Sequence, residues 1–157
     1  MSHGFYRAFE DSFRGSRASI LGRLDAYNPF VAPLAKAYPN AGTFDIGCGR
    51  GEWLEKMGRL GLRASGVDLD EGMLAACLQL NLDAKLGDGI EHLKALDDES
   101  FLVISAFHVV EHISFEQIES IYKEALRVLM PGGILILETP NPENLIVATK
   151  NFYLDPS

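Results

Sequence analysis

The chain has 157 residues, a formal net charge of −8 at pH 7 and a hydrophobic content of 47%. This length and composition predict one globular domain with a substantial core. The net negative charge disfavours non-specific binding to the nucleic-acid backbone, so we expect no nucleic-acid partner. No apolar run is long enough to cross a membrane, no signal-peptide pattern opens the chain, and the two cysteines predict no disulfide framework. We therefore expect a cytoplasmic protein.

Residues 1–40 predict a helical cap ahead of the core. Aromatic side chains recur at near-helical spacing through residues 5–13, which indicates an amphipathic helix. Ser16 is placed to cap a second helix, and Pro29 suits the first turn of a third. We expect the core to occupy residues 41–157.

A glycine loop opens that core. Phe44 and Ile46, on either side of Asp45, predict the end of a buried strand, and a helix follows from Glu52. The glycines at positions 47, 49 and 51 let the backbone turn sharply and let a ligand come close. Strand, glycine loop and helix together are typical of a Rossmann-like unit. The dinucleotide fingerprint would need a third glycine at position 52, where the chain has a glutamate.

The charges around this loop point to a particular ligand. Asp45 and Glu52 would repel a pyrophosphate but suit a ligand that carries a sulfonium and an amino group, such as S-adenosylmethionine. Positions 45–51 read Asp-Ile-Gly-Cys-Gly-Arg-Gly, which resembles motif I of the class I S-adenosylmethionine-dependent methyltransferases. The resemblance implies that Gly47, Cys48 and Gly49 bind this cofactor. Alternatively, Asp45 is a buried strand-end residue that caps the loop.

Further residues of the cofactor site follow from the same resemblance. In the cap, Arg14 or Arg17 is a candidate partner of the cofactor carboxylate, with packing and solvated arginines as the alternative. The strand predicted at 62–69 ends in Asp68, at the spacing of an acidic residue that accepts from ribose hydroxyls. The resemblance also places Leu69 against the adenine. After the strand at 82–86 it places Asp88 at the adenine amine, although an ordinary turn is an alternative. The remaining implied contacts are Gly89, Ile90, Ser105 and Phe107.

The second half of the chain predicts the acceptor side. Residues 101–107 indicate a strand buried on both faces, followed by His108, Glu111 and His112. A capping box at Ser114 starts a long helix, and residues 134–137 indicate a fifth strand. Strands alternate with helices, so we expect an α/β fold of the Rossmann-like, doubly wound type, with a mainly parallel sheet and helices on both faces. The last two strands of the resembling family would be missing, so we expect a fragment of a longer chain.

Methyl transfer needs an acceptor held in line and a group that takes its proton. His108 and His112 are the catalytic candidates, with His108 as the base. Alternatively, His108 orients the ligand and His112 bonds to backbone. The pattern His108-x-x-Glu111-His112 also has an interpretation as a metal site, because small-RNA methyltransferases bind magnesium through a related Glu-x-x-Glu-His pattern. Histidine replaces the first glutamate here and no fourth ligand is evident, so we expect no metal.

The wider resemblance is to methyltransferase domains found with the glycosyltransferases of bacterial glycan and O-antigen assembly. The segments that carry it are residues 5–10, 13–17, 107–112 and 139–144. It implies O-methylation of a sugar in surface-polysaccharide synthesis, with a glycan acceptor and fusion to a glycosyltransferase. The alternatives are a small-molecule enzyme of the quinone type, a tRNA-modifying enzyme, and a cofactor-binding module without catalysis. An exposed sheet edge at 134–137 also predicts self-association.

Overall fold

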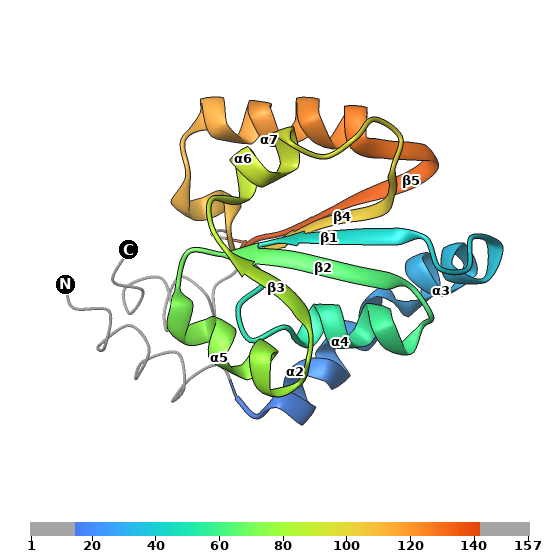
Figure 1. The fold of residues 1–157 in the computed structure, drawn as a ribbon, viewed down its shortest axis with the longest axis vertical. Coiled ribbons are helices and arrows are strands. Elements are labelled where there is room, and N and C mark those ends of the chain that lie inside the picture. The colour runs from blue at the N-terminus through green and yellow to red at the C-terminus, as the bar shows by residue number, and fades with distance from the viewer. Residues whose placement is uncertain (1–14, 142–157) are drawn as a thin grey trace.

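The computed structural model describes residues 15–141, whose centre is a five-stranded parallel sheet of order β3-β2-β1-β4-β5 (Figure 1). Its strands are β1 (Gly42–Ile46), β2 (Arg63–Asp68), β3 (Asp83–Leu86), β4 (Phe101–Phe107) and β5 (Leu129–Glu138). The order reverses direction beside β1, as in doubly wound sheets, whose ligands bind outside the carboxyl ends of the strands at this point. The predicted Rossmann-like α/β fold is confirmed.

Helices cover both faces of the sheet (Figure 1). The elements are α2 (Arg17–Leu24), η1 (Asp25–Tyr27), α3 (Asn28–Ala37), α4 (Glu52–Arg59), α5 (Glu71–Gln79), α6 (Gly89–Lys94), η2 (Val110–His112) and α7 (Phe115–Val128). On the α6 and α7 face, Ile104 and Ile121 belong to one buried cluster. On the other face, Ile20 and Val31 share a second cluster with Trp53. The segment before β1 is therefore packed into the core by its apolar side chains.

The helix starts follow local sequence signals. Ser16, Asp70 and Ser114 cap α2, α5 and α7 as predicted, and the capping box between Ser114 and Gln117 is complete. Side-chain oxygens at these positions accept from backbone N–H groups that have no partner within the helix. Residues before position 15, including the first predicted helix, lie outside the described residues.

Strand β5 differs from the prediction because it begins at Leu129, five residues before position 134. The turn sequence Pro131-Gly132-Gly133 lies within the strand, where the register with β4 shifts between Phe101 and Val103. Gly132 has a φ of +86°, so the irregularity uses the left-handed conformation that glycine adopts readily. These residues therefore bend the strand, and the predicted strand at 134–137 is its regular second half.

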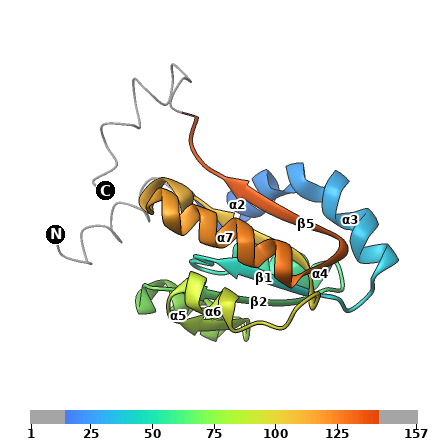
Figure 2. The same ribbon diagram turned by 90° about the horizontal axis from the view of Figure 1, so that it is seen from above.

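Among the described residues β5 pairs with β4 alone, and beside it lies an apolar groove of about 600 Å³. Figure 2 shows β5 next to α3, and the groove lies between them. It is lined by Tyr27, Pro29, Phe30, Pro33, Leu34 and residues 134–137. Self-association through this edge stays a prediction. In the part of the chain that the structure describes, no helix is long and apolar enough to cross a membrane.

Candidate functional site

The loop after β1 lies at the carboxyl edge of the sheet and takes a shape that needs glycine. Gly47, Gly49 and Gly51 have φ values of +68°, +53° and +77°. A Cβ on Gly51 would lie 2.6 Å from Leu82 Cδ1 and 2.8 Å from Cys77 Sγ. Both the conformation and the close packing against α5 therefore exclude larger residues at this position.

Asp68 joins this loop to the end of β2. Its Oδ2 accepts a 2.7 Å hydrogen bond from the Gly49 N–H, and its Oδ1 accepts a 2.8 Å bond from the Asp70 N–H. Each carboxylate oxygen has a second lone pair, so the side chain can accept from two further hydroxyls. Leu69 is 75% exposed and adds an apolar surface beside it. This arrangement of a diol acceptor next to an apolar surface fits a nucleoside.

Asp45 is buried, with 3% exposure, and accepts a 2.6 Å hydrogen bond from Ser105 Oγ on the neighbouring strand β4. The structure thus brings two predicted cofactor residues together, in the buried strand-end position that was the alternative for Asp45. Cys48 is also buried, and its backbone N–H donates to Val67 O at 2.9 Å. A hydrogen bond with Cys77 and burial raise the pKa of the Cys48 thiol, which disfavours the thiolate form.

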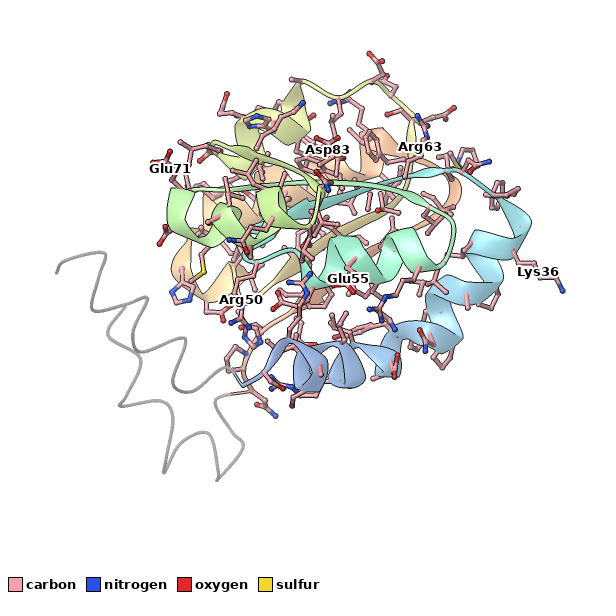
Figure 3. All side chains as sticks on the ribbon, turned by 60° about the horizontal axis from the view of Figure 1, so that its bottom comes forward. Lys36, Arg50, Glu55, Arg63, Glu71 and Asp83 are labelled. Carbon is pink, nitrogen blue, oxygen red and sulfur yellow. The ribbon has the colours of Figure 1, made fainter. Side chains whose placement is uncertain are left out.

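Glu52 does not repel an anionic ligand as we expected, because its charge is offset by arginine. Its carboxylate is 3% exposed and lies 2.9 Å from Arg50 Nη2 and 3.8 Å from Arg17 Nη1. Figure 3 shows Arg50 and Glu55 on the side of α4 that faces α2. The preference for a cationic ligand therefore cannot rest on Glu52.

Arg17 lies behind the glycine loop. Its Nη1 and Nη2 donate to the carbonyl oxygens of Arg50 and Gly51, at 2.8 and 3.2 Å, and its Nε donates to Glu55 at 2.7 Å. These bonds occupy the guanidinium at the back of the loop, so its role is to support the loop. Arg14, the other candidate for the cofactor carboxylate, lies outside the described residues.

Asp88 caps α6, and its Oδ1 accepts from the Ile90 and Glu91 N–H groups at 2.9 Å each. The turn alternative is therefore present, and it uses one of the two carboxylate oxygens. Gly89 packs on Ile46 so closely that a Cβ would clash. Ile90 is buried in the core, so Asp88 is the exposed residue among the three predicted cofactor residues Asp88, Gly89 and Ile90.

His108 follows β4 directly and lies between two carboxylates. Its Nδ1 is 3.4 Å from Glu111 Oε1, and its Nε2 is 3.3 Å from Glu138 Oε1 at the end of β5. Its backbone N–H donates to the Glu138 carbonyl at 2.8 Å. His108 has a φ of +56°, a sparsely populated conformation for a non-glycine residue and one that clusters at functional sites. A Cβ on Gly47 would lie 2.6 Å from Val109 Cγ2, so this turn lies against the glycine loop.

His112, the second catalytic candidate, lies further from Glu111 than His108 does. Its Nε2 is 4.0 Å from Glu111 Oε1. The helical face that the metal interpretation required is not formed, because His108 is left-handed and η2 begins only at Val110. The described residues contain no group of three or more His, Cys, Asp or Glu arranged to hold a metal ion.

Two residues of this site were missed from the sequence. Glu138 is the last residue of an apolar strand. Ligands of such sheets bind at the carboxyl ends of the strands, so this position was a sequence signal that it could be a site residue. Tyr27 packs against Phe107, with ring centroids 5.4 Å apart. Its hydroxyl, however, also donates to Glu138 Oε2. Burial, followed by this hydrogen bond, raises the pKa of Tyr27 well above its usual value, so the hydroxyl stays protonated.

This parallel sheet, with a glycine loop after β1 and an acidic residue after β2, has the fold of the class I S-adenosylmethionine-dependent methyltransferases. Residues 44–137 match the family described as a methyltransferase domain, and the chain belongs to that family. A solved S-adenosylmethionine-dependent methyltransferase from Archaeoglobus fulgidus is 34% identical, with a TM-score of 0.84, over 97% of this chain and 65% of that one.

Curated relatives share the same region. A human mitochondrial ubiquinone biosynthesis O-methyltransferase is 34% identical over 86% of this chain and 41% of its own length. The ubiquinone biosynthesis O-methyltransferase of Xanthomonas campestris is 30% identical over 75% of this chain and 52% of its own. The chain thus spans about half the length of these relatives.

Proposed function

We propose that the protein transfers the methyl group of S-adenosylmethionine to a hydroxyl oxygen, with His108 as the base that takes the hydroxyl proton. The observation that carries this is the imidazole of His108 beside the carboxylates of Glu111 and Glu138, on a turn that lies against the glycine loop. A base of this kind must lie where the cofactor and the acceptor meet.

The residues around the loop fit the cofactor. Asp68 would accept from the ribose hydroxyls, Leu69 would cover the adenine, and Asp88 would accept from its amine through the oxygen that the helix cap leaves over. The absent side chains at Gly47, Gly49 and Gly51 suit a ligand held close to the backbone. When bound, the cofactor supplies a methyl group on a positively charged sulfur.

The charges beside His108 favour the proton transfer. Neutral imidazole has one nitrogen with a free electron pair, which can take the proton as the acceptor oxygen forms its new bond to carbon. The imidazolium that results lies between the carboxylates of Glu111 and Glu138, at 3.4 and 3.3 Å. His108 is 53% exposed, so the proton can pass on to solvent.

The comparisons favour one acceptor class over the other. Both curated relatives are ubiquinone biosynthesis O-methyltransferases, which supports the small-molecule alternative of the quinone type. Nothing in the comparisons supports the sugar of a surface polysaccharide that the wider resemblance implied. We therefore propose a hydroxyl of an aromatic quinone precursor as the acceptor, and fusion to a glycosyltransferase stays a prediction.

Transfer of radiolabelled methyl groups to quinone-precursor catechols, with nucleotide sugars and lipid-linked oligosaccharides in parallel, tests this function. We expect the catechols to be labelled. His108→Gln should lower turnover by about 10²-fold or more and leave cofactor affinity, measured by calorimetry, nearly intact. Labelling of the sugars alone would show that the acceptor is a sugar and not a quinone precursor. Unchanged turnover in His108→Gln would show that His108 is not the base. Cofactor binding without transfer to any acceptor would support a binding module.

A further inference from the structure

His108 has two carboxylate neighbours at nearly equal distances, and they are held differently. Glu138 lies in the β5 ladder, where its carbonyl accepts from the His108 N–H at 2.8 Å. Its side chain is also held, because Oε2 accepts from the Tyr27 hydroxyl while Oε1 lies 3.3 Å from His108 Nε2. Glu111 belongs to the short helix η2, and its carboxylate lies 3.4 Å from His108 Nδ1 and 4.0 Å from His112 Nε2.

Tyr27 is itself fixed by packing. Its ring meets Trp53 edge-on, with centroids 5.7 Å apart, and Phe107 edge-on at 5.4 Å. The rings of Trp53 and Phe107 also pack against one another, with centroids 4.9 Å apart. A ring held by two aromatic neighbours directs its hydroxyl along one line. This hydroxyl is thereby a rigid donor to one oxygen of Glu138.

The consequence concerns the tautomer of the imidazole. A neutral imidazole carries its proton on one nitrogen, and the hydrogen bond made there selects which one. Because the Tyr27 hydroxyl donates to Oε2, Oε1 is the Glu138 oxygen left near the imidazole, 3.3 Å from Nε2, where it is placed to accept from an Nε2–H. The electron pair then lies on Nδ1, next to Glu111, where the second carboxylate can stabilise the imidazolium as it forms.

We propose that Tyr27 and Glu138 are positioning residues that fix His108 in the Nε2–H tautomer and thereby make Nδ1 the proton-accepting atom. The catalytic part of this inference rests on the proposed function of His108, whereas the tautomer itself does not. With the cofactor bound, the proton of the acceptor hydroxyl would move to Nδ1 as the oxygen–carbon bond forms and the methyl–sulfur bond breaks, the electron pair of that bond staying on sulfur. The proton would then leave to solvent. No further reactant is needed.

The test is two-bond 1H–15N correlation spectroscopy on the ¹⁵N-histidine-labelled chain, which reports the tautomer of each imidazole. The His108 signals are assigned by their loss in His108→Gln. We expect the Nε2–H form in the wild type and a mixture of both tautomers in Tyr27→Phe and Glu138→Gln. Tyr27→Phe keeps the aromatic packing and removes only the donor. Tyr122→Phe, on an exposed tyrosine of α7, is the matched control and should leave the His108 signals unchanged.

Turnover separates positioning from simple loss of structure. Tyr27→Phe should lower turnover by about tenfold, less than His108→Gln, while cofactor affinity and the near-UV spectrum stay at wild-type values. A wild-type His108 in the Nδ1–H form, or the same tautomer in all variants, would overturn the proposal. A tautomer change with full activity in His108→Gln would keep the positioning contact and overturn the proposed base. If Tyr27→Phe is fully active while His108→Gln is inactive, His108 remains the base, but the claim that Tyr27 supports turnover by fixing the tautomer is overturned.

Discussion

The two sides of the site are built differently. On the cofactor side, the glycine loop, Asp68 and Asp88 are held by bonds to backbone N–H groups at the strand ends and helix starts. On the proposed acceptor side, His108 lies beside the side chains of Glu111 and Glu138, and the bond from Tyr27 to Glu138 spans 111 positions. The first side is shaped by the backbone and the second by side-chain contacts across the fold.

This difference predicts different responses to substitution. Changes on the cofactor side should disturb the fold and cofactor binding together, because the same backbone serves both. Changes on the acceptor side should alter turnover with the fold intact, because the side chains there lie on elements that their own packing already holds. The His108 and Tyr27 variants described above test the acceptor side, and the four substitutions below test the cofactor side and its independence from α7, in order of expected effect.

Gly51→Ala should have the largest effect. The left-handed φ of +77° costs an alanine about 1–2 kcal/mol, and the contacts with Leu82 and Cys77 add about 1–3 kcal/mol of overpacking. Urea unfolding should show the loss, and cofactor affinity should fall with it. Gly58→Ala, on the same helix α4 with open space around it, is the control and should stabilise by about 0.5–1 kcal/mol. Equal stability of the Gly51→Ala and Gly58→Ala variants would contradict the claim that position 51 requires glycine.

Asp68→Ala should come next and should affect binding and stability at once. Cofactor affinity should fall at least tenfold, because hydrogen bonds to a charged group contribute about 1.5–3 kcal/mol each. The melting temperature without cofactor should also fall, since the Gly49 and Asp70 N–H groups lose their acceptor. Asp68→Asn keeps one acceptor oxygen and should lose less on both measures. Wild-type affinity in the folded alanine variant would make Asp68 purely structural.

The sequence predicted the strands, the glycine loop and the helix caps because these features follow from local constraints, whereas the roles of the cofactor residues stay predictions. Glycine positions, capping residues and strand periodicity are read within a few residues, and the confirmed caps at Ser16, Asp70 and Ser114 are of this kind. The acceptor side was predicted only at His108, which directly follows a strand. Tyr27 and Glu138 could not be paired, because no local pattern reports which side chains meet across the sheet.

Charge was the least predictable property for the same reason. Glu52 looked like a free carboxylate beside the loop, but α2 and the loop itself bring Arg17 and Arg50 to it. Arg17 looked like a partner for the cofactor carboxylate, but its donors meet loop carbonyls. The sign of a charge is read from the sequence, whereas its partner depends on the packing of distant elements.

Arg17→Ala tests whether α2 supports the cofactor side from behind. Loss of its bonds to the Arg50 and Gly51 carbonyls should lower cofactor affinity by about 1 kcal/mol, roughly fivefold. Arg59→Ala is the matched control, because Arg59 pairs with the same Glu55 from an exposed position, and within the described part of the chain no hydrogen bond or ion pair joins it to the loop. Calorimetry should separate the two variants. Equal losses in both would assign the effect to Glu55 instead of the loop.

Ser114→Ala should have the smallest effect and should confine it to stability. The Ser114 hydroxyl accepts from the Gln117 N–H at the start of α7, two residues after η2. Loss of such a cap costs about 1 kcal/mol, which corresponds to a few degrees in melting temperature. Cofactor affinity should not change, because no bond of the glycine loop or Asp68 involves α7 among the described residues. An affinity loss as large as that of Arg17→Ala would show that the two sides are coupled through the packing of α7, and the comparison between them would fail.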